Sequence, residues 1–258
     1  MDIGLNLFSI RNNVKTEEDF LETANKLKEA GYDYMQFSGS PLPADAIKRV
    51  VEASAMPVYL THMPMDRIIG DTQKLMEEHA SFGCKNIGLG AMPPNKIADE
   101  DECKKIIEQL NTAGEVMAKN GFNFFYHHHH FEFYKWQNET VFEYMIKNAP
   151  AINFTIDTYW LQYGGADICD VLDKVKGRAG CVHLKDYKVK ASTNDRGNVS
   201  FSPVFAPLGD GNLDFNKIVK KMEEIGTEYY FVEQDNAADF DDPFEQVIRS
   251  VNYAKKEL

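Results

Sequence analysis

Short apolar runs alternate with longer charged segments along the whole chain, at a period of about 30 residues. Each charged segment carries apolar residues at the three- and four-residue spacings of an amphipathic helix. In segment 16–30, for example, Phe20, Ala24 and Leu27 share one face, and Gly31 follows as a helix-ending residue. Parallel strands joined by crossover helices produce this rhythm. Eight such units in 258 residues predict an α/β fold, a single (β/α)8 TIM barrel domain over residues 1–258.

The predicted elements follow one another without a linker or a break in composition. We expect strands at 3–8, 32–37, 57–62, 86–89, 122–127, 152–157, 181–185 and 229–233. We expect the main helices at 16–30, 44–53, 72–82, 99–120, 141–148, 168–176, 214–225 and 243–255. The polar stretch 188–207 has few helix signals and is predicted to be an enlarged loop. An open doubly wound sheet is the competing architecture, but its usual GxGxxG phosphate-binding signature is missing.

The composition is that of a globular, acidic protein. Hydrophobic residues make up 43% of the chain, charged residues make up 26%, and the net charge is −12. This charge argues against a nucleic-acid partner. No run approaches the roughly 18 apolar residues that a membrane helix needs, so we expect no membrane partner. The four scattered cysteines form no CxxC pair, and nothing resembles a signal peptide, so we expect a cytoplasmic protein.

Reactive side chains concentrate where the predicted strands end. In a TIM barrel these strand ends and the loops after them form the active-site face. Six of the seven histidines lie there, and acidic residues end two of the strands. The relevant segments are His62, 126–132, 155–157, 182–186 and 231–235. Two imidazoles and two carboxylates from adjacent strand ends would suit one divalent ion, Mn, Co, Zn, Fe or Mg.

Each of these residues also has a purely structural interpretation. His128 and His130 can be solvated loop residues, and Asp157 can cap a helix. Tyr159 and Trp160 can be packing residues, although their place beside Asp157 also suits a substrate wall. Buried carboxylates and imidazoles are costly unless paired or bound to a cation, which favours a functional role for the set as a whole.

At these residues the sequence resembles the xylose isomerase-like TIM-barrel superfamily, in its sugar phosphate isomerase/epimerase branch. The resemblance covers essentially the whole chain. Members of this superfamily include ketose 3-epimerases, inosose dehydratases, dehydroshikimate dehydratases and endonuclease IV. The matching segments, in order, are 4–11, 126–133, 157–160, 164–167, 177–178, 183–186 and 232–235.

The resemblance implies a divalent metal held by residues at the ends of the last four strands. Asp157, His183 and Glu233 match three ligand positions. The fourth is typically Glu in the epimerases, and here it is His127, as in the inosose dehydratase pattern. Glu132 is an alternative ligand or acid/base group.

The function implied is a metal-dependent sugar isomerase/epimerase that acts on a keto sugar through an enediolate. Glu233 or Glu132 would be the general base, and Lys185 would stabilise the developing negative charge. The alternative is a dehydratase (a lyase) of a keto-inositol or 3-keto sugar, because elimination shares the same intermediate. The partner would be a small-molecule carbohydrate, contacted by residues that surround the expected metal site: Phe8, Arg11, His62, His129, Tyr159 and Trp160.

Two other classes of function remain to be considered. An endonuclease of the endonuclease IV type would need a three-zinc cluster and a basic surface, which the net charge of −12 disfavours. A non-catalytic sugar-binding barrel would bind a keto sugar without turnover. A homo-oligomer is possible for any of these functions.

Overall fold

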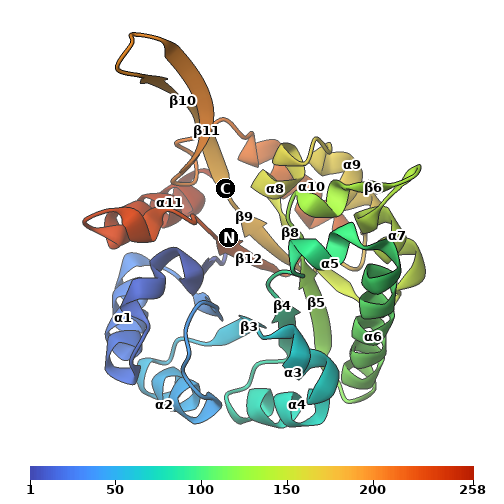
Figure 1. The fold of residues 1–258 in the computed structure, drawn as a ribbon. Helices are drawn as coiled ribbons and strands as arrows, with labels where there is room; N and C mark the ends of the chain where they lie inside the picture. The colour runs from blue at the N-terminus through green and yellow to red at the C-terminus, as the bar shows by residue number, and fades with distance from the viewer.

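The eight apolar runs form the strands of a closed, parallel barrel (Figure 1). The computed structural model describes residues 1–258. Every neighbouring pair in the barrel is parallel, and β1 closes the barrel against β12. This confirms the predicted (β/α)8 TIM barrel. The strands, in chain order, are β1 Gly4–Asn6, β2 Tyr34–Phe37, β3 Val58–His62, β4 Asn86–Leu89, β5 Asn123–His127, β8 Asn153–Asp157, β9 Cys181–Leu184 and β12 Tyr229–Val232.

One main helix follows each barrel strand and packs its apolar face on the outside of the barrel. Several helices begin at a side-chain cap and end at a left-handed glycine; α1, for example, begins after Thr16 and ends at Gly31. The main helices are α1 Glu17–Ala30, α2 Ala44–Ser54, α4 Thr72–Ser81, α6 Glu100–Lys119, α7 Val141–Asn148, α9 Ile168–Lys174, α10 Phe215–Ile225 and α11 Pro243–Glu257.

Shorter elements decorate the end of the barrel where the strands finish. They are η1 Leu7–Asn13, α3 Met65–Gly70, α5 Pro94–Ala98, η2 Phe131–Phe133, α8 Thr158–Tyr163, η3 Ala237–Asp239 and the small hairpin of β6 Lys135–Trp136 and β7 Glu139–Thr140. The first strand is therefore shorter than the predicted 3–8, because the chain turns into η1 after Asn6, whose side chain accepts a hydrogen bond from the Phe8 N–H at 3.1 Å.

The core has two parts, one between the strands and helices and one inside the barrel. Sixty buried residues form the outer layer. The inner part is small and consists of Tyr34, Leu60, Phe125, Cys181 and Phe231. A Cβ on Gly4 would lie 2.3 Å from the Tyr34 ring, so a glycine in β1 gives this ring its place inside the barrel.

The prediction of a loop at 188–207 is wrong. Strands β10 Asp186–Thr193 and β11 Val199–Ala206 pair as an antiparallel hairpin that projects beyond the helices (Figure 1, orange). The alternation of Lys188, Val189, Lys190 and Ala191 has the period of two that a strand requires, and Gly197 lies in the connecting turn with a positive φ. A search for helix signals alone does not detect this pattern.

Candidate active site

A polar layer lies directly above the small apolar layer inside the barrel. Side chains two residues apart on a strand point to the same side. Tyr34, Phe125 and Phe231 therefore place Gln36, His127 and Glu233, respectively, on the inner face, one step nearer the strand ends. Leu60 and Cys181 place His62 and His183 in the same way. The period of the strands thus gathers the strand-end histidines and carboxylates at one end of the barrel.

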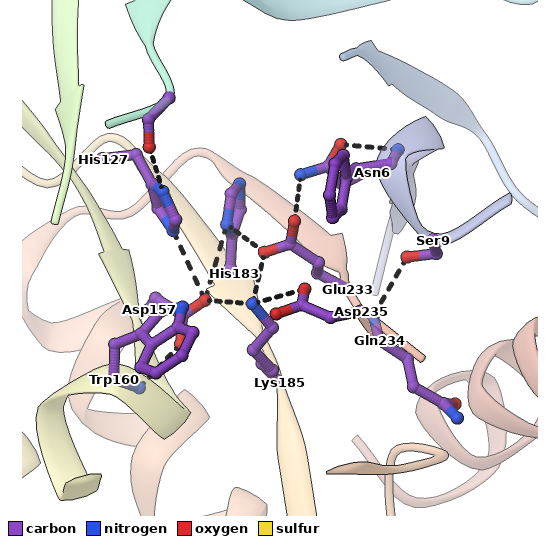
Figure 2. A network of polar contacts seen from close by, with 12 residues as sticks. Asn6, Ser9, His127, Asp157, Trp160, His183, Lys185, Glu233, Gln234 and Asp235 are labelled. Atoms are coloured by element: carbon purple, nitrogen blue, oxygen red, sulfur yellow. Dashed lines mark hydrogen bonds and ion pairs between the residues drawn. The ribbon is translucent and has the colours of Figure 1, made fainter. Parts of the chain in front are cut away.

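Four of these side chains form a compact, buried group. His127, Asp157, His183 and Glu233 each offer one ligand atom, and these atoms all lie within 4.8 Å of one another. His127 Nε2 and His183 Nδ1 lie 3.4 and 3.7 Å from Asp157 Oδ2, and His183 Nδ1 lies 2.8 Å from Glu233 Oε2 (Figure 2). Such a group can hold a divalent metal ion.

Each of the four side chains also has a polar atom that points away from the group, and this outer atom makes a separate hydrogen bond. His127 Nδ1 donates to Gly90 O at 2.8 Å, and Asp157 Oδ1 accepts from Trp160 N at 2.9 Å. His183 Nε2 donates to Gln36 Oε1 at 2.7 Å, with the imidazole proton placed by this acceptor. Each imidazole therefore directs its other nitrogen toward the group, where a metal ion would bind it in the unprotonated form.

The inner atoms of His183 and Glu233 fit a bound cation. His183 Nδ1 and Glu233 Oε2 are both buried and lie 2.8 Å apart, and the other close partner of Glu233 Oε2 is Lys185 Nζ at 3.0 Å. Glu233 Oε1, in contrast, accepts from Asn6 Nδ2 at 2.7 Å. A divalent ion bound between these two atoms would replace the proton that they share and would be held by both.

The charges in the group act strongly on one another. Burial by itself would lower the pKa of His183, but Glu233 and Asp157 raise the pKa to about 9. Burial alone would raise the pKa of Asp157, but Lys185 and the two histidines hold it well below its usual range. Glu233 behaves in the same way, with its pKa lowered by Lys185 and His183. Both carboxylates are therefore ionised and ready to bind a cation.

Lys185 is a buried ammonium surrounded by carboxylates. Its Nζ lies 2.8 Å from Asp235 Oδ1, 3.0 Å from Glu233 Oε2 and 3.3 Å from Asp157 Oδ2. Although burial lowers the pKa of Lys185, these three carboxylates raise it above its usual value. The Nζ also lies 5.2 Å from the centre of the Trp160 ring. Lys185 therefore keeps its proton at neutral pH.

A cavity of about 350 Å³ opens over the group. Its size suits a single sugar or cyclic polyol. Its two carboxylates, Glu233 and Asp235, both come from the end of β12. The cavity is lined by Phe8, Ser38, Gly39, His62, Gly90, Ala91, His127, His129, Lys185, Glu233 and Asp235.

Six of the expected site residues lie outside this lining: Asp157 and His183, which are buried in the ligand group, and the four residues described here. Glu132 is buried, with one carboxylate oxygen accepting from the Tyr126 hydroxyl at 2.7 Å and the other from His129 N at 2.8 Å. Arg11 Nη1 donates to the backbone carbonyl of Asp235 at 2.8 Å and so supports the β12 loop. Tyr159 and Trp160 lie behind Lys185, where Tyr159 packs on Phe205 with a centroid distance of 4.7 Å. Trp160 and Phe205 therefore contact the Lys185 ammonium, and Tyr159 packs behind Phe205.

The structural alternatives have mixed outcomes. Asp157 does cap α8, and its other oxygen joins the ligand group, so the two interpretations hold together. His128 is not solvated: it is buried, and its Nε2 accepts from Asp157 N at 3.1 Å. Burial lowers the pKa of His128 to about 3. His130 is exposed, as expected for a loop residue.

Sequence reasoning did not single out three residues of the site. Asn6 and Gln36 hold the outer atoms of Glu233 and His183, and Asp235 binds Lys185. Asn6 and Gln36 are polar residues inside otherwise buried strands, which is the signal that identifies them. Asp235 shares an alternation phase with Glu233 two residues earlier.

The structure defines a TIM barrel whose strand ends carry a buried His/carboxylate group that could hold a metal ion. Residues 24–256 match the model of the xylose isomerase-like TIM barrel family, and the chain belongs to that family. No helix is long and apolar enough to cross a bilayer.

Relatives with curated names are dehydratases. The chain is 26% identical to an inosose dehydratase of Clostridium perfringens strain 13, over 93% of this chain and 90% of the relative. It is 31% identical to an inosose dehydratase of Geobacillus thermodenitrificans NG80-2, over 62% of this chain and 56% of the relative. Among solved structures, a sugar phosphate isomerase/epimerase of Parabacteroides distasonis ATCC 8503 superposes with a TM-score of 0.82. It shares 23% identity, over 99% of this chain and 94% of that one.

Proposed function

We propose that the protein is a metal-dependent dehydratase of a keto-inositol or a related cyclic polyol ketone. One observation carries this choice over the isomerase/epimerase expected from the sequence. Both carboxylates that line the cavity come from the end of β12, whereas the oxygens of Glu132 are bound to Tyr126 and to the His129 N–H. A two-carboxylate epimerase needs a carboxylate on each face of the sugar. Elimination needs one base and one acid, which the lining provides.

The proposed ligands are His127, Asp157, His183 and Glu233. A divalent ion held there would act as a Lewis acid on the ketone oxygen and its neighbouring hydroxyl, which lowers the pKa of the α C–H bond. Glu233 has both oxygens engaged, one by Asn6 and one in the ligand group. The base is therefore Asp235, whose pKa burial raises above its usual value while Lys185 lowers it.

Two residues, Asp235 and Lys185, account for both proton transfers of the elimination. Asp235 takes the α-proton, and the electrons of the C–H bond expel the β-hydroxyl, which leaves as water with a proton from Lys185. The products are an unsaturated ketone and water. Lys185 Nζ lies 2.8 Å from Asp235 Oδ1, so the proton taken from carbon can return to the lysine and restore both groups. The curated relatives named inosose dehydratase support the same reaction class.

Isomerisation or epimerisation of a keto sugar is the second candidate. The observation in its favour is that His62 and His129 line the cavity from strands other than β12, so polar groups surround the substrate position on more than one side. Both imidazoles are neutral, since burial lowers the pKa of His129 to about 2 and that of His62 well below its usual value.

One experiment separates the two candidates. The metal-reconstituted protein is incubated with keto-inositols and keto sugars in D2O, and the products are analysed by NMR and mass spectrometry. We expect a product that is one water lighter than its substrate. Deuterium incorporation with inversion or carbonyl migration and no loss of water would refute the dehydratase proposal in favour of the second candidate. Asp235→Asn should lose turnover and retain the metal, whereas Asp241→Asn, an exposed aspartate in the following loop, should retain both.

A further inference from the structure

The β10–β11 hairpin carries an apolar face that its own chain leaves uncovered. Every residue from 188 to 203 is exposed. On one face, the cross-strand pairs are Val189 with Pro203, Ala191 with Phe201 and Thr193 with Val199. Phe201, Val199 and Val189 are 71%, 59% and 57% exposed.

The other face of the hairpin is polar and basic. It pairs Lys188 with Val204, Lys190 with Ser202 and Ser192 with Ser200, whose hydroxyls lie 2.8 Å apart. A two-stranded hairpin alone is marginally stable in water, and exposed apolar strands invite association. This alternation of a mainly apolar and a mainly polar face is the pattern of a strand pair that is covered on one side.

Charge indicates what covers the hairpin. Between Tyr187 and Phe205 the chain has three cations and one anion, a net charge of +2 in a protein with a net charge of −12. Another exposed aromatic, Phe240 (45% exposed), lies after β12 at the same end of the barrel. It is flanked by three exposed acids: Asp239, Asp241 and Asp242. Asp239 lies 3.6 Å from Arg11 of its own chain, whereas Asp241 and Asp242 make no ion pair. This loop therefore presents an exposed apolar side chain beside negative charges, which complements the apolar face and the positive charge of the hairpin.

We propose that the hairpin is a docking arm for a second copy of this chain, with its apolar face packed on the acidic Phe240 loop of that copy. Phe201 and Val199 would contact Phe240 of the partner subunit, while Lys188, Lys190 and Arg196 lie near its aspartates. Two such contacts related by a two-fold axis give a closed dimer. Both loops lie at the active-site end, so the two cavities of the dimer face the interface. This proposal concerns association only and is independent of the reaction proposed above.

The test is the mass in solution, measured by sedimentation equilibrium at micromolar chain concentrations. We expect the wild type to be a dimer and Phe201→Lys to raise the dissociation constant by about 30-fold or more, because it places a charge in the contact. Ser202→Lys, the neighbouring residue on the polar face, is the matched control and should remain a dimer. A monomeric wild type, an unchanged Phe201→Lys dimer, or equal loss in both variants would each overturn the proposal.

A charge exchange tests the chosen partner surface. Lys190→Glu and Asp241→Lys should each weaken the dimer, and their combination should restore it, since opposite charges face each other again. Asp241 is exposed and makes no ion pair within its own chain, so its substitution leaves the fold intact, as circular dichroism would verify. Failure of the combination to recover affinity over the single variants would refute the Phe240 loop as the docking surface.

Discussion

Asn6 Nδ2 donates a hydrogen bond of 2.7 Å to Glu233 Oε1, which joins residues 227 positions apart across the seam where β1 meets β12. This bond leaves Glu233 Oε2 directed into the proposed ligand group. Asn6, from the first strand of the barrel, thus positions a carboxylate that follows the last strand.

Asn6→Ala should weaken metal binding by about 10- to 100-fold, the usual effect of removing a hydrogen bond behind a ligand. Competition with a chelator of known affinity measures this change. Asn12→Ala serves as the control, because Asn12 is exposed and its side chain makes only one 3.5 Å contact, to Ala238 O. Equal affinities for Asn6→Ala and the wild type would contradict the positioning role.

Metal removal should lower thermal stability, because an ion that binds only the folded state stabilises it by mass action. At a free concentration about 100-fold above Kd the gain is about 3 kcal/mol. Tm measured with and without chelator detects this difference. The double variant Asp157→Ala/His183→Ala should show no response to metal; a retained response would place the binding site elsewhere.

Lys185→Met should reduce kcat by about 10²- to 10⁴-fold while the protein still binds metal, because the substitution removes the proton donor and leaves the four ligands. Steady-state kinetics measures the loss of kcat, and metal analysis of the same preparation measures the retained metal. Lys188→Met, an exposed lysine of the hairpin, should keep wild-type kcat. Full activity in Lys185→Met would exclude the lysine from the reaction.

Glu132 should make stability fall as pH rises. Burial raises the pKa of Glu132 to about 7 from 4.5, even though Tyr126 and His129 lower it. The folded state therefore keeps a proton that the unfolded state loses above about pH 4.5, so stability is lost between about pH 4.5 and 7. The difference is of the order of 3 kcal/mol.

Glu132→Gln should remove this pH dependence, as urea unfolding at pH 5 and pH 8 would measure. The exposed Glu108→Gln is the matched control. Because Glu132 does not line the cavity, Glu132→Gln should also retain activity. A large loss of kcat at unchanged stability would restore Glu132 as the acid/base group expected from the sequence.

Gly4→Ala should destabilise the fold by about 1–3 kcal/mol, since the new Cβ would lie 2.3 Å from Tyr34 and 2.9 Å from Phe231. Gly180→Ala offers a comparison, because its Cβ would lie 3.5 Å from the Phe125 ring, an ordinary contact. Denaturant midpoints for the two variants give the comparison directly. Similar midpoints would show that Tyr34 can move aside.

The barrel could be predicted because each strand–helix unit carries its own signal, as the run ending in His127 and the helix after it illustrate. The proposed ligands could be predicted because a TIM barrel brings its strand ends together whatever the loops between them do. The hairpin was missed because exposed strands lack an apolar run. The orientation of Glu132 could not be predicted either. It depends on η2, which turns the side chain toward the Tyr126 hydroxyl, and the sequence does not show the direction of that turn.

The proposed ligands come from β5, β8, β9 and β12, and Asn6 comes from β1, so no contiguous fragment short of the closed barrel contains the whole set. A nascent chain still lacking β12 would offer three ligands and no anchored fourth. Metal binding at full affinity therefore requires the last step of folding, the pairing of β12. A metal-bound protein is one in which the final strand is in its native register.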